Sequence, residues 1–123
     1  MRAIDQVQHC ASMSQVRAQV DALDDILAPL LVTRCGYMTQ AARIKNDPSR
    51  VRDEARIEAI VARVRRMAAA EGGQPDLMER IYRALMECCI AYEHEELARM
   101  QALAAAGAHS QPQPAPQLQG EPQ

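Results

Sequence analysis

Two basic side chains interrupt an apolar helical pattern in the first third of the chain. Arg34 and Lys45 are eleven positions apart, almost three helical turns, which puts both cations on one side about 16 Å apart along the axis. Because an unpaired buried cation is costly, we expect an anion between them, either a protein carboxylate or a ligand. A buried ion pair without a ligand, or a frayed helix end that leaves Lys45 in water, also fits the pattern. The other residues of this face are apolar: Val16, Val20, Leu23, Leu27, Leu30, Met38 and Ala41.

A carboxylate also occurs on the apolar side of a later segment. Glu93 follows Cys89 by four positions and Met86 by seven, so it lies on the apolar side of another helical pattern. The alternative is a solvated residue near a helix end. His94, Glu95 and Glu96 come next without a second ligand group at metal-binding spacing, so we predict a solvent-exposed face and no metal.

The two cations belong to a long helix predicted over residues 12–47. Ser12 with Gln15 fits a capping box at its start, and turn-forming residues from Asn46 to Ser49 mark its end. Pro29 falls inside the pattern, but the apolar phase continues unchanged across it. We therefore predict one bent helix in preference to two.

A second helix is predicted from Asp53, as its N-cap, to about Glu71. The pair Gly72 and Gly73 ends it. Its apolar side is predicted to comprise Ile57, Ile60, Val61, Val64 and Met67.

A third helix is predicted after Pro75. Asp76 with Glu79 fits a second capping box, and the helical pattern continues to about Ala106. From residue 107 to residue 123 the chain consists mainly of Gln, Pro, Ala and Gly, with too little apolar content to order itself. We predict an arm over residues 1–11, a helical domain over 12–106 and a disordered tail over 107–123.

The composition favours an all-α protein. The chain has 123 residues, the size of one domain, and contains no Trp or Phe and three Tyr. Ala, Leu, Arg and Glu dominate, so helix formers take the place of strand formers.

Charge and cysteine usage exclude several function classes. A formal net charge of −2 gives no general attraction to nucleic acid, and acidic neighbours dilute the arginines of residues 50–66.

No stretch of eighteen apolar residues and no leader pattern is present, so we expect a cytoplasmic protein without a membrane partner. The four cysteines lack zinc spacing, which predicts free thiols in a reducing compartment.

The length of the first helix predicts a homodimer. At about 50 Å it is too long for helices of about 18 and 30 residues to cover its apolar stripe at both ends. An antiparallel, interlocked homodimer buries the stripe with two-fold symmetry. Arg17 lies about 100° around the helix from Arg34 and about 25 Å away, so it would reach the partner's pocket instead of its own.

Four segments together resemble the all-helical chorismate mutase family. They are Gln15–Asp21 (QVRAQVD), Leu30–Arg34 (LLVTR), Tyr37–Lys45 (YMTQAARIK) and Val51–Arg56 (VRDEAR), and Ile90–Glu93 (IAYE) is similar to the family's last segment. The resemblance covers about residues 12–98. The chain is also similar to the isochorismate pyruvate-lyase branch of that family, which shares its shorter loop between Lys45 and Arg56.

The resemblance implies interlocked dimers of three-helix chains, each dimer with two equivalent pockets for a small dicarboxylate. By match, Arg34 and Arg56 of one chain and Arg17 of the other would clamp the two substrate carboxylates. Lys45 would donate a hydrogen bond to the ether oxygen whose bond to carbon breaks. Asp53 would orient the substrate hydroxyl.

Val51 would line the pocket wall. The implied reaction, rearrangement of chorismate to prephenate, needs no nucleophile, metal or cofactor.

Two positions depart from the family pattern. Glu93 stands where many members carry Gln, and a carboxyl group there donates a hydrogen bond only when protonated, so we predict higher activity below neutral pH. Ile57 stands where bacterial mutases often carry Glu, which suggests a weaker mutase or isochorismate as substrate. Asp53 favours the mutase. The hypotheses are therefore a mutase first, an isochorismate pyruvate-lyase giving salicylate and pyruvate second, and a non-catalytic helical binding module third.

Overall fold

The computed structural model describes the backbone of residues 1–110 and the side chains of residues 1–108. Its elements are the short 3-10 helix η1 (Ala3–Gln6), the helix α1 (Met13–Lys45), the 3-10 helix η2 (Pro48–Arg50), and the helices α2 (Glu54–Ala70) and α3 (Pro75–Ser110). No strand occurs in this part of the chain. The prediction of an all-α chain with a long first helix is confirmed.

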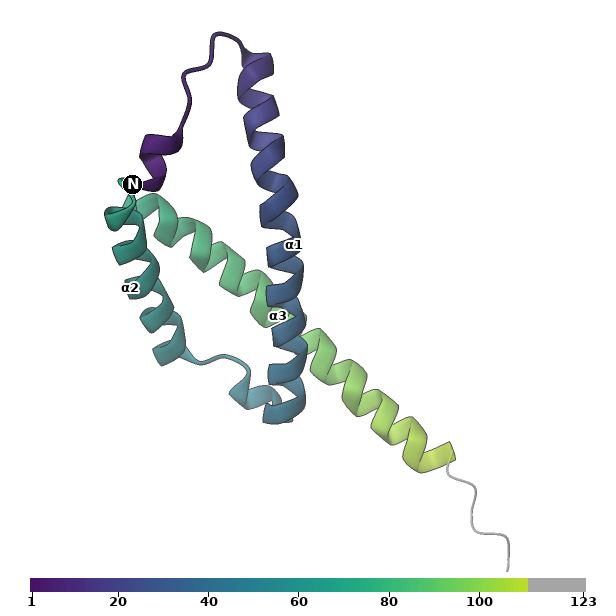
Figure 1. The fold of residues 1–123 in the computed structure, drawn as a ribbon. Helices are drawn as coiled ribbons and strands as arrows, with labels where there is room; N and C mark the ends of the chain where they lie inside the picture. The colour runs from purple at the N-terminus through teal and green to yellow at the C-terminus, as the bar shows by residue number, and fades with distance from the viewer. Residues whose placement is uncertain (111–123) are drawn as a thin grey trace, which may run out of the picture.

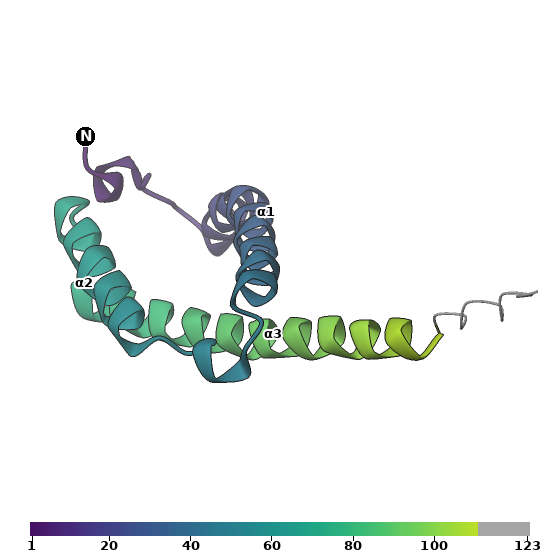
Figure 2. The same ribbon diagram turned by 90° about the horizontal axis from the view of Figure 1, so that it is seen from below.

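Both α1 and α2 pack against α3, as Figure 1 shows. In the perpendicular view of Figure 2, the two helices stand on the same side of α3. One small core joins Ala42 of α1 to Val51 and to Leu97 of α3, and another joins Ile57 and Val61 of α2 to α3. The space between the three helices is thus bounded by the C-terminal half of α1, by α2 and by the middle of α3.

The predicted start of α1 is confirmed. Ser12 has extended backbone angles, and its Oγ accepts a hydrogen bond from the Gln15 amide at 3.2 Å. The Gln15 side chain returns to accept one from the Ala11 amide at 2.7 Å. Two amide groups at the helix start are thereby satisfied by side chains.

The helix continues through Pro29 as a single element, which confirms the choice of one helix over two. Thr33 Oγ1 donates a hydrogen bond to the Pro29 carbonyl at 3.2 Å. The helix ends at Lys45, two residues before the predicted limit, because Asn46 turns into the left-handed region with φ 51°. Its amide donates to the Ala42 carbonyl at 2.9 Å and so closes the helix.

The start of α2 is also confirmed, since Asp53 caps it by accepting a hydrogen bond from the Arg56 amide at 3.0 Å. The helix ends beside Gly72, whose φ of 76° favours glycine. One predicted core position is wrong: Met67 is half exposed and Ala68 is buried in its place. The buried face follows residues 57, 61, 64 and 68, a spacing that passes over position 67.

The predicted capping box of α3 is wrong. The helix begins at Pro75, and its first backbone hydrogen bond runs from the Met78 amide to the Gln74 carbonyl. Asp76 therefore lies in the first turn. Its carboxylate instead accepts a hydrogen bond from Arg65 Nη1 at 2.9 Å, and Glu79 accepts another at 2.8 Å.

The third helix is longer than predicted and is described as far as Ser110. Residues 107–110 are therefore helical, contrary to the predicted disordered tail. The remainder of that prediction, over residues 111–123, lies outside the described residues. No helix in the described part of the chain is long and apolar enough to cross a membrane.

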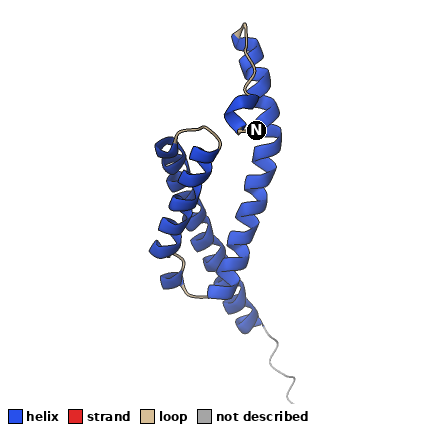
Figure 3. Cartoon of the chain, turned by 60° about the vertical axis from the view of Figure 1, so that its left-hand side comes forward, coloured by secondary structure: helices blue, strands red, loops and turns tan. Residues whose placement is uncertain are grey.

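The N-terminal half of α1 stands clear of α2 and α3, which Figures 1 and 3 both show. Every residue from 11 to 30 is exposed, and Ala42 is the buried residue that α1 contributes. Its apolar stripe is open to solvent at Val16, Val20, Leu23, Leu27 and Leu30.

Candidate functional site

A cavity of about 300 Å³ lies between the three helices. It contains six of the seven site residues predicted from the sequence: Arg34, Lys45, Val51, Asp53, Arg56 and Glu93. The remaining walls are formed by Met38 and Ala41 of α1, Ile57 and Ile60 of α2, and Met86, Cys89 and Ile90 of α3. Arg17, the seventh, lies in the N-terminal half of α1 and does not line this cavity.

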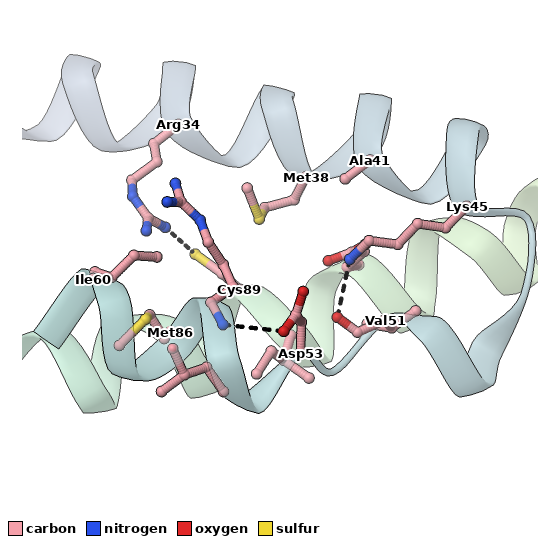
Figure 4. Close-up of a pocket in the computed structure, with 13 residues that line it drawn as sticks. Arg34, Met38, Ala41, Lys45, Val51, Asp53, Ile60, Met86 and Cys89 are labelled. Carbon is pink, nitrogen blue, oxygen red and sulfur yellow. Dashed lines mark hydrogen bonds and ion pairs between the residues drawn. The ribbon is translucent and has the colours of Figure 1, made fainter.

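Lys45 and Glu93 meet at one end of the cavity. Lys45 Nζ lies 2.9 Å from Glu93 Oε1 and donates a hydrogen bond to the Val51 carbonyl at 3.0 Å. Figure 4 shows this end of the pocket. The Glu93 residue is 3% exposed, so the alternative of a solvated glutamate is wrong. The Lys45 side chain is also largely covered, so a frayed helix end does not describe it.

The ion pair leaves Glu93 with spare capacity for hydrogen bonding. The approach of Lys45 is close, but Glu93 Oε1 receives no well-aligned hydrogen bond from the described residues. A buried carboxylate oxygen without such a bond is uncommon in folded proteins and often marks a site that a ligand completes. The Lys45 side chain therefore has its counter-ion within the chain, and the same carboxyl group faces the cavity.

Arg34 has a different partner. Its Nη1 donates a hydrogen bond to Cys89 Sγ at 3.0 Å, drawn as a dashed line in Figure 4. Burial raises the pKa of the Cys89 thiol, although the Arg34 guanidinium acts in the opposite direction. The raised pKa keeps the thiol neutral near pH 7, so Cys89 accepts the hydrogen bond without neutralising the charge of Arg34.

The charges of the pocket favour an anionic ligand. Three cations, Arg34, Lys45 and Arg56, face it with two carboxylates, Asp53 and Glu93. Among the described residues, neither Arg34 nor Arg56 forms an ion pair with a carboxylate. Two guanidinium groups at a cavity are suited to planar, two-point binding of carboxylates.

Asp53 both caps α2 and lines the pocket. Its Oδ1 caps α2, and the cap fixes the turn that carries Arg56 into the cavity. One carboxylate oxygen is used in this way. The cap therefore positions both an acidic group and a guanidinium at the same end of α2.

Sequence reasoning gave Cys89 no role, and the structure places its thiol against Arg34. The sequence does place Cys89 on the pocket side of its helix, because it lies one helical turn before Glu93 on the same face. Its contact with Arg34 depends on the crossing of α1 over α3, which no local pattern encodes.

Among the comparisons with known proteins, the one with family models agrees with this arrangement. Searches of curated proteins and of solved structures gave no significant match. The family model described as chorismate mutase type II matches residues 16–94, which include Arg17 and all six residues that line the cavity. Since the match covers more than half of the chain, the protein belongs to the chorismate mutase type II family.

Proposed function

We propose that the protein is a chorismate mutase, which rearranges chorismate to prephenate in the pocket between α1, α2 and α3. The observation that carries this proposal is the presence of Arg34 and Arg56 at a cavity where neither has a carboxylate partner among the described residues. Chorismate carries two carboxylates and fits a site with two such guanidinium groups. The family match supplies the reaction class.

The proposed mechanism is conformational and electrostatic. Arg34 and Arg56 each bind a substrate carboxylate, and the apolar walls at Met38, Ile60 and Met86 hold the substrate in its compact conformer. One C–O bond breaks and one C–C bond forms within the same molecule. Negative charge develops on the ether oxygen, and Lys45 donates a hydrogen bond to it in the transition state.

Glu93 is proposed as a second donor to the ether oxygen. A carboxylate cannot donate a hydrogen bond, so the group must be protonated in the active complex. Its oxygen Oε1 receives no well-aligned hydrogen bond in the described residues, which supports a group that engages fully only with a ligand. Activity should therefore be higher below neutral pH and fall as pH rises.

The active form is proposed to be an antiparallel homodimer. Residues 11–30 are exposed along their whole length, although this segment carries five residues of the apolar stripe. A second copy of α1 would cover that stripe. In this arrangement the partner's Arg17 would reach the pocket and join Arg34 and Arg56 at the substrate carboxylates.

One observation favours an isochorismate pyruvate-lyase as the second candidate. Ile57 is buried and lines the pocket, so α2 offers an apolar surface where many bacterial mutases offer a carboxylate. A substrate whose hydroxyl is attached at another ring position, such as isochorismate, would not need a carboxylate at position 57 and could bind against this apolar surface. Asp53 remains at the pocket rim and supports the mutase.

The test is to offer purified protein chorismate and isochorismate separately between about pH 5 and pH 9. Prephenate from chorismate, decreasing with pH, is the expected result. Salicylate and pyruvate from isochorismate, with little prephenate, would replace the mutase by the lyase. Turnover of neither would reject both enzymes and favour a binding module of the same fold.

A further inference from the structure

The N-terminal arm, residues 1–11, is fastened to the far end of α2. The Ile4 amide donates a hydrogen bond to the Glu71 carbonyl at 3.1 Å, and the Ala3 amide donates to the Glu71 carboxylate. The Ile4 side chain sits against Gly72, where any Cβ would collide with it. The arm therefore ends on α2, although it leads into the free end of α1.

The attachment of the arm to α2 closes the chain into a ring, here called the frame. The chain leaves η1, crosses to Ser12, descends along α1 to its contact with α3, and returns through α2 to the arm, as Figures 1 and 2 show. Within it, a cavity of about 610 Å³ lies between the arm and the N-terminal half of α1. Its apolar lining includes Val7, Val16, Val20 and Leu23, all of them exposed.

The arm is therefore held in place without covering the apolar residues beneath it. Val7 is 73% exposed and Leu23 is 64% exposed. A peptide segment fixed by hydrogen bonds over an uncovered apolar helix face implies an occupant that is absent from the single chain. The occupant must be elongated and apolar on the sides that face the arm and α1.

The helix α1 of a second copy has the required shape and chemistry, an argument that rests on the proposed dimer. An antiparallel register that pairs the partner's Arg17 with Arg34 also pairs the partner's Leu31 with Val20. The partner's helix would then run from the pocket, along the exposed stripe and past the arm. At 33 residues, or about 50 Å, α1 is long enough both to reach the partner's pocket and to pass its arm.

We propose that the N-terminal arm is a strap that closes over the partner's α1, and that Val7, Val20 and Leu23 form the surface that contacts it. By two-fold symmetry, each chain would enclose the long helix of the other. The two chains then separate only after Ile4 leaves Gly72 and the hydrogen bonds to Glu71 break. The strap controls how fast subunits exchange, in addition to how tightly they bind.

The first experiment measures subunit exchange. Isotope-labelled and unlabelled dimers are mixed, and the formation of mixed dimers is followed by native mass spectrometry. Ile4→Asp removes the apolar contact of the strap, and exchange should become about tenfold faster or more. Leu103→Asp introduces the same charge at an exposed apolar residue of α3 far from the arm, and it should leave the rate unchanged.

A deletion of residues 1–8 provides a second variant, with its helix content checked by circular dichroism. Equal exchange rates in the full chain, Ile4→Asp and the deletion would overturn the strap while leaving the dimer intact. A wild-type protein that sediments as a monomer would instead overturn the dimer itself and the strap with it.

A photoreactive amino acid at Val7 tests the contact directly. Irradiation should give cross-linked dimers in which residue 7 is joined to the partner's α1, near residue 31. Cross-links confined to the same chain would contradict the proposal. Mixing isotope-labelled with unlabelled chains before irradiation distinguishes the two products by mass.

Discussion

Lys45 Nζ lies 2.9 Å from Glu93 Oε1, so Lys45, which was predicted to require an anion, is paired with a carboxyl group of α3. The pair joins the last turn of α1 to the middle of α3 at one end of the pocket. Its geometry leaves Oε1 without a well-aligned hydrogen bond in the described residues. The two residues thus face each other at this end of the pocket, and both present polar atoms to a ligand.

Glu93→Gln should remove the decline of mutase activity with rising pH. An amide donates a hydrogen bond at every pH, whereas a carboxyl group donates only when protonated. The variant should therefore keep at pH 9 most of its activity at pH 6, while the wild-type protein loses activity. Profiles of kcat/KM against pH give the comparison, and the same decline in both proteins would exclude Glu93 as the titrating group.

Arg34→Ala should reduce kcat/KM by at least about a hundredfold, because it removes a cation proposed to hold a substrate carboxylate. Arg34 has no ion pair among the described residues, so the variant should keep its helix content and thermal midpoint. Arg63→Ala, an exposed arginine of α2 outside the pocket, is the matched control. A large loss of stability in Arg34→Ala with normal turnover would mean that the residue is structural.

Asp53→Ser separates the helix cap from the pocket carboxylate. Serine caps helices about as well as aspartate, so the free energy of unfolding should change little. Asp53→Ala should lose about 1 kcal/mol through the missing cap. If Asp53 also orients the substrate hydroxyl, both variants should lose activity to a similar degree. Full activity in Asp53→Ser would limit the residue to its capping role.

Glu96 should make the fold sensitive to acid. Hydrogen bonds from Arg99 and then from Thr39 lower the pKa of its carboxyl group to about 2, from a usual value of 4.5. Because the folded state lowers this pKa, its contribution to stability is complete above about pH 4.5 and is lost as pH falls toward 2. Glu96→Gln should therefore flatten the dependence of thermal midpoint on pH in that range. An unchanged dependence would assign the acid sensitivity to other carboxylates.

Local patterns predicted much of this structure. The caps at Ser12 and Asp53 were readable because a cap depends on residues within one turn of each other. The shared face of Arg34 and Lys45 followed from helical periodicity alone. The predicted capping box at Asp76 failed because Pro75 at the first helical position was the stronger signal, and Asp76 was available to Arg65.

Contacts between distant segments were beyond local patterns. The Lys45–Glu93 pair, the hydrogen bond from Arg34 to Cys89, and the attachment of Ile4 to Glu71 each join residues at least 48 positions apart. Position 67 was misassigned because the direction from which α3 approaches α2 decides which of two neighbouring residues is buried. The predicted limit of α3 at about Ala106 followed the change of composition from Gly107 onward, but the helix continues through residues 107–110.

In the proposed dimer, the exposed half of α1 would link the proposed active site to the concentration of the protein. In the proposed dimer, residues 11–30 gain their packing only when two chains meet, so folding and association become one equilibrium. Dilution would then unfold part of α1 and, by carrying Arg17 away from its partner's pocket, dismantle both sites together. The thermal midpoint of such a dimer rises with protein concentration. The concentration of the chain would therefore set the fraction of it that forms complete sites.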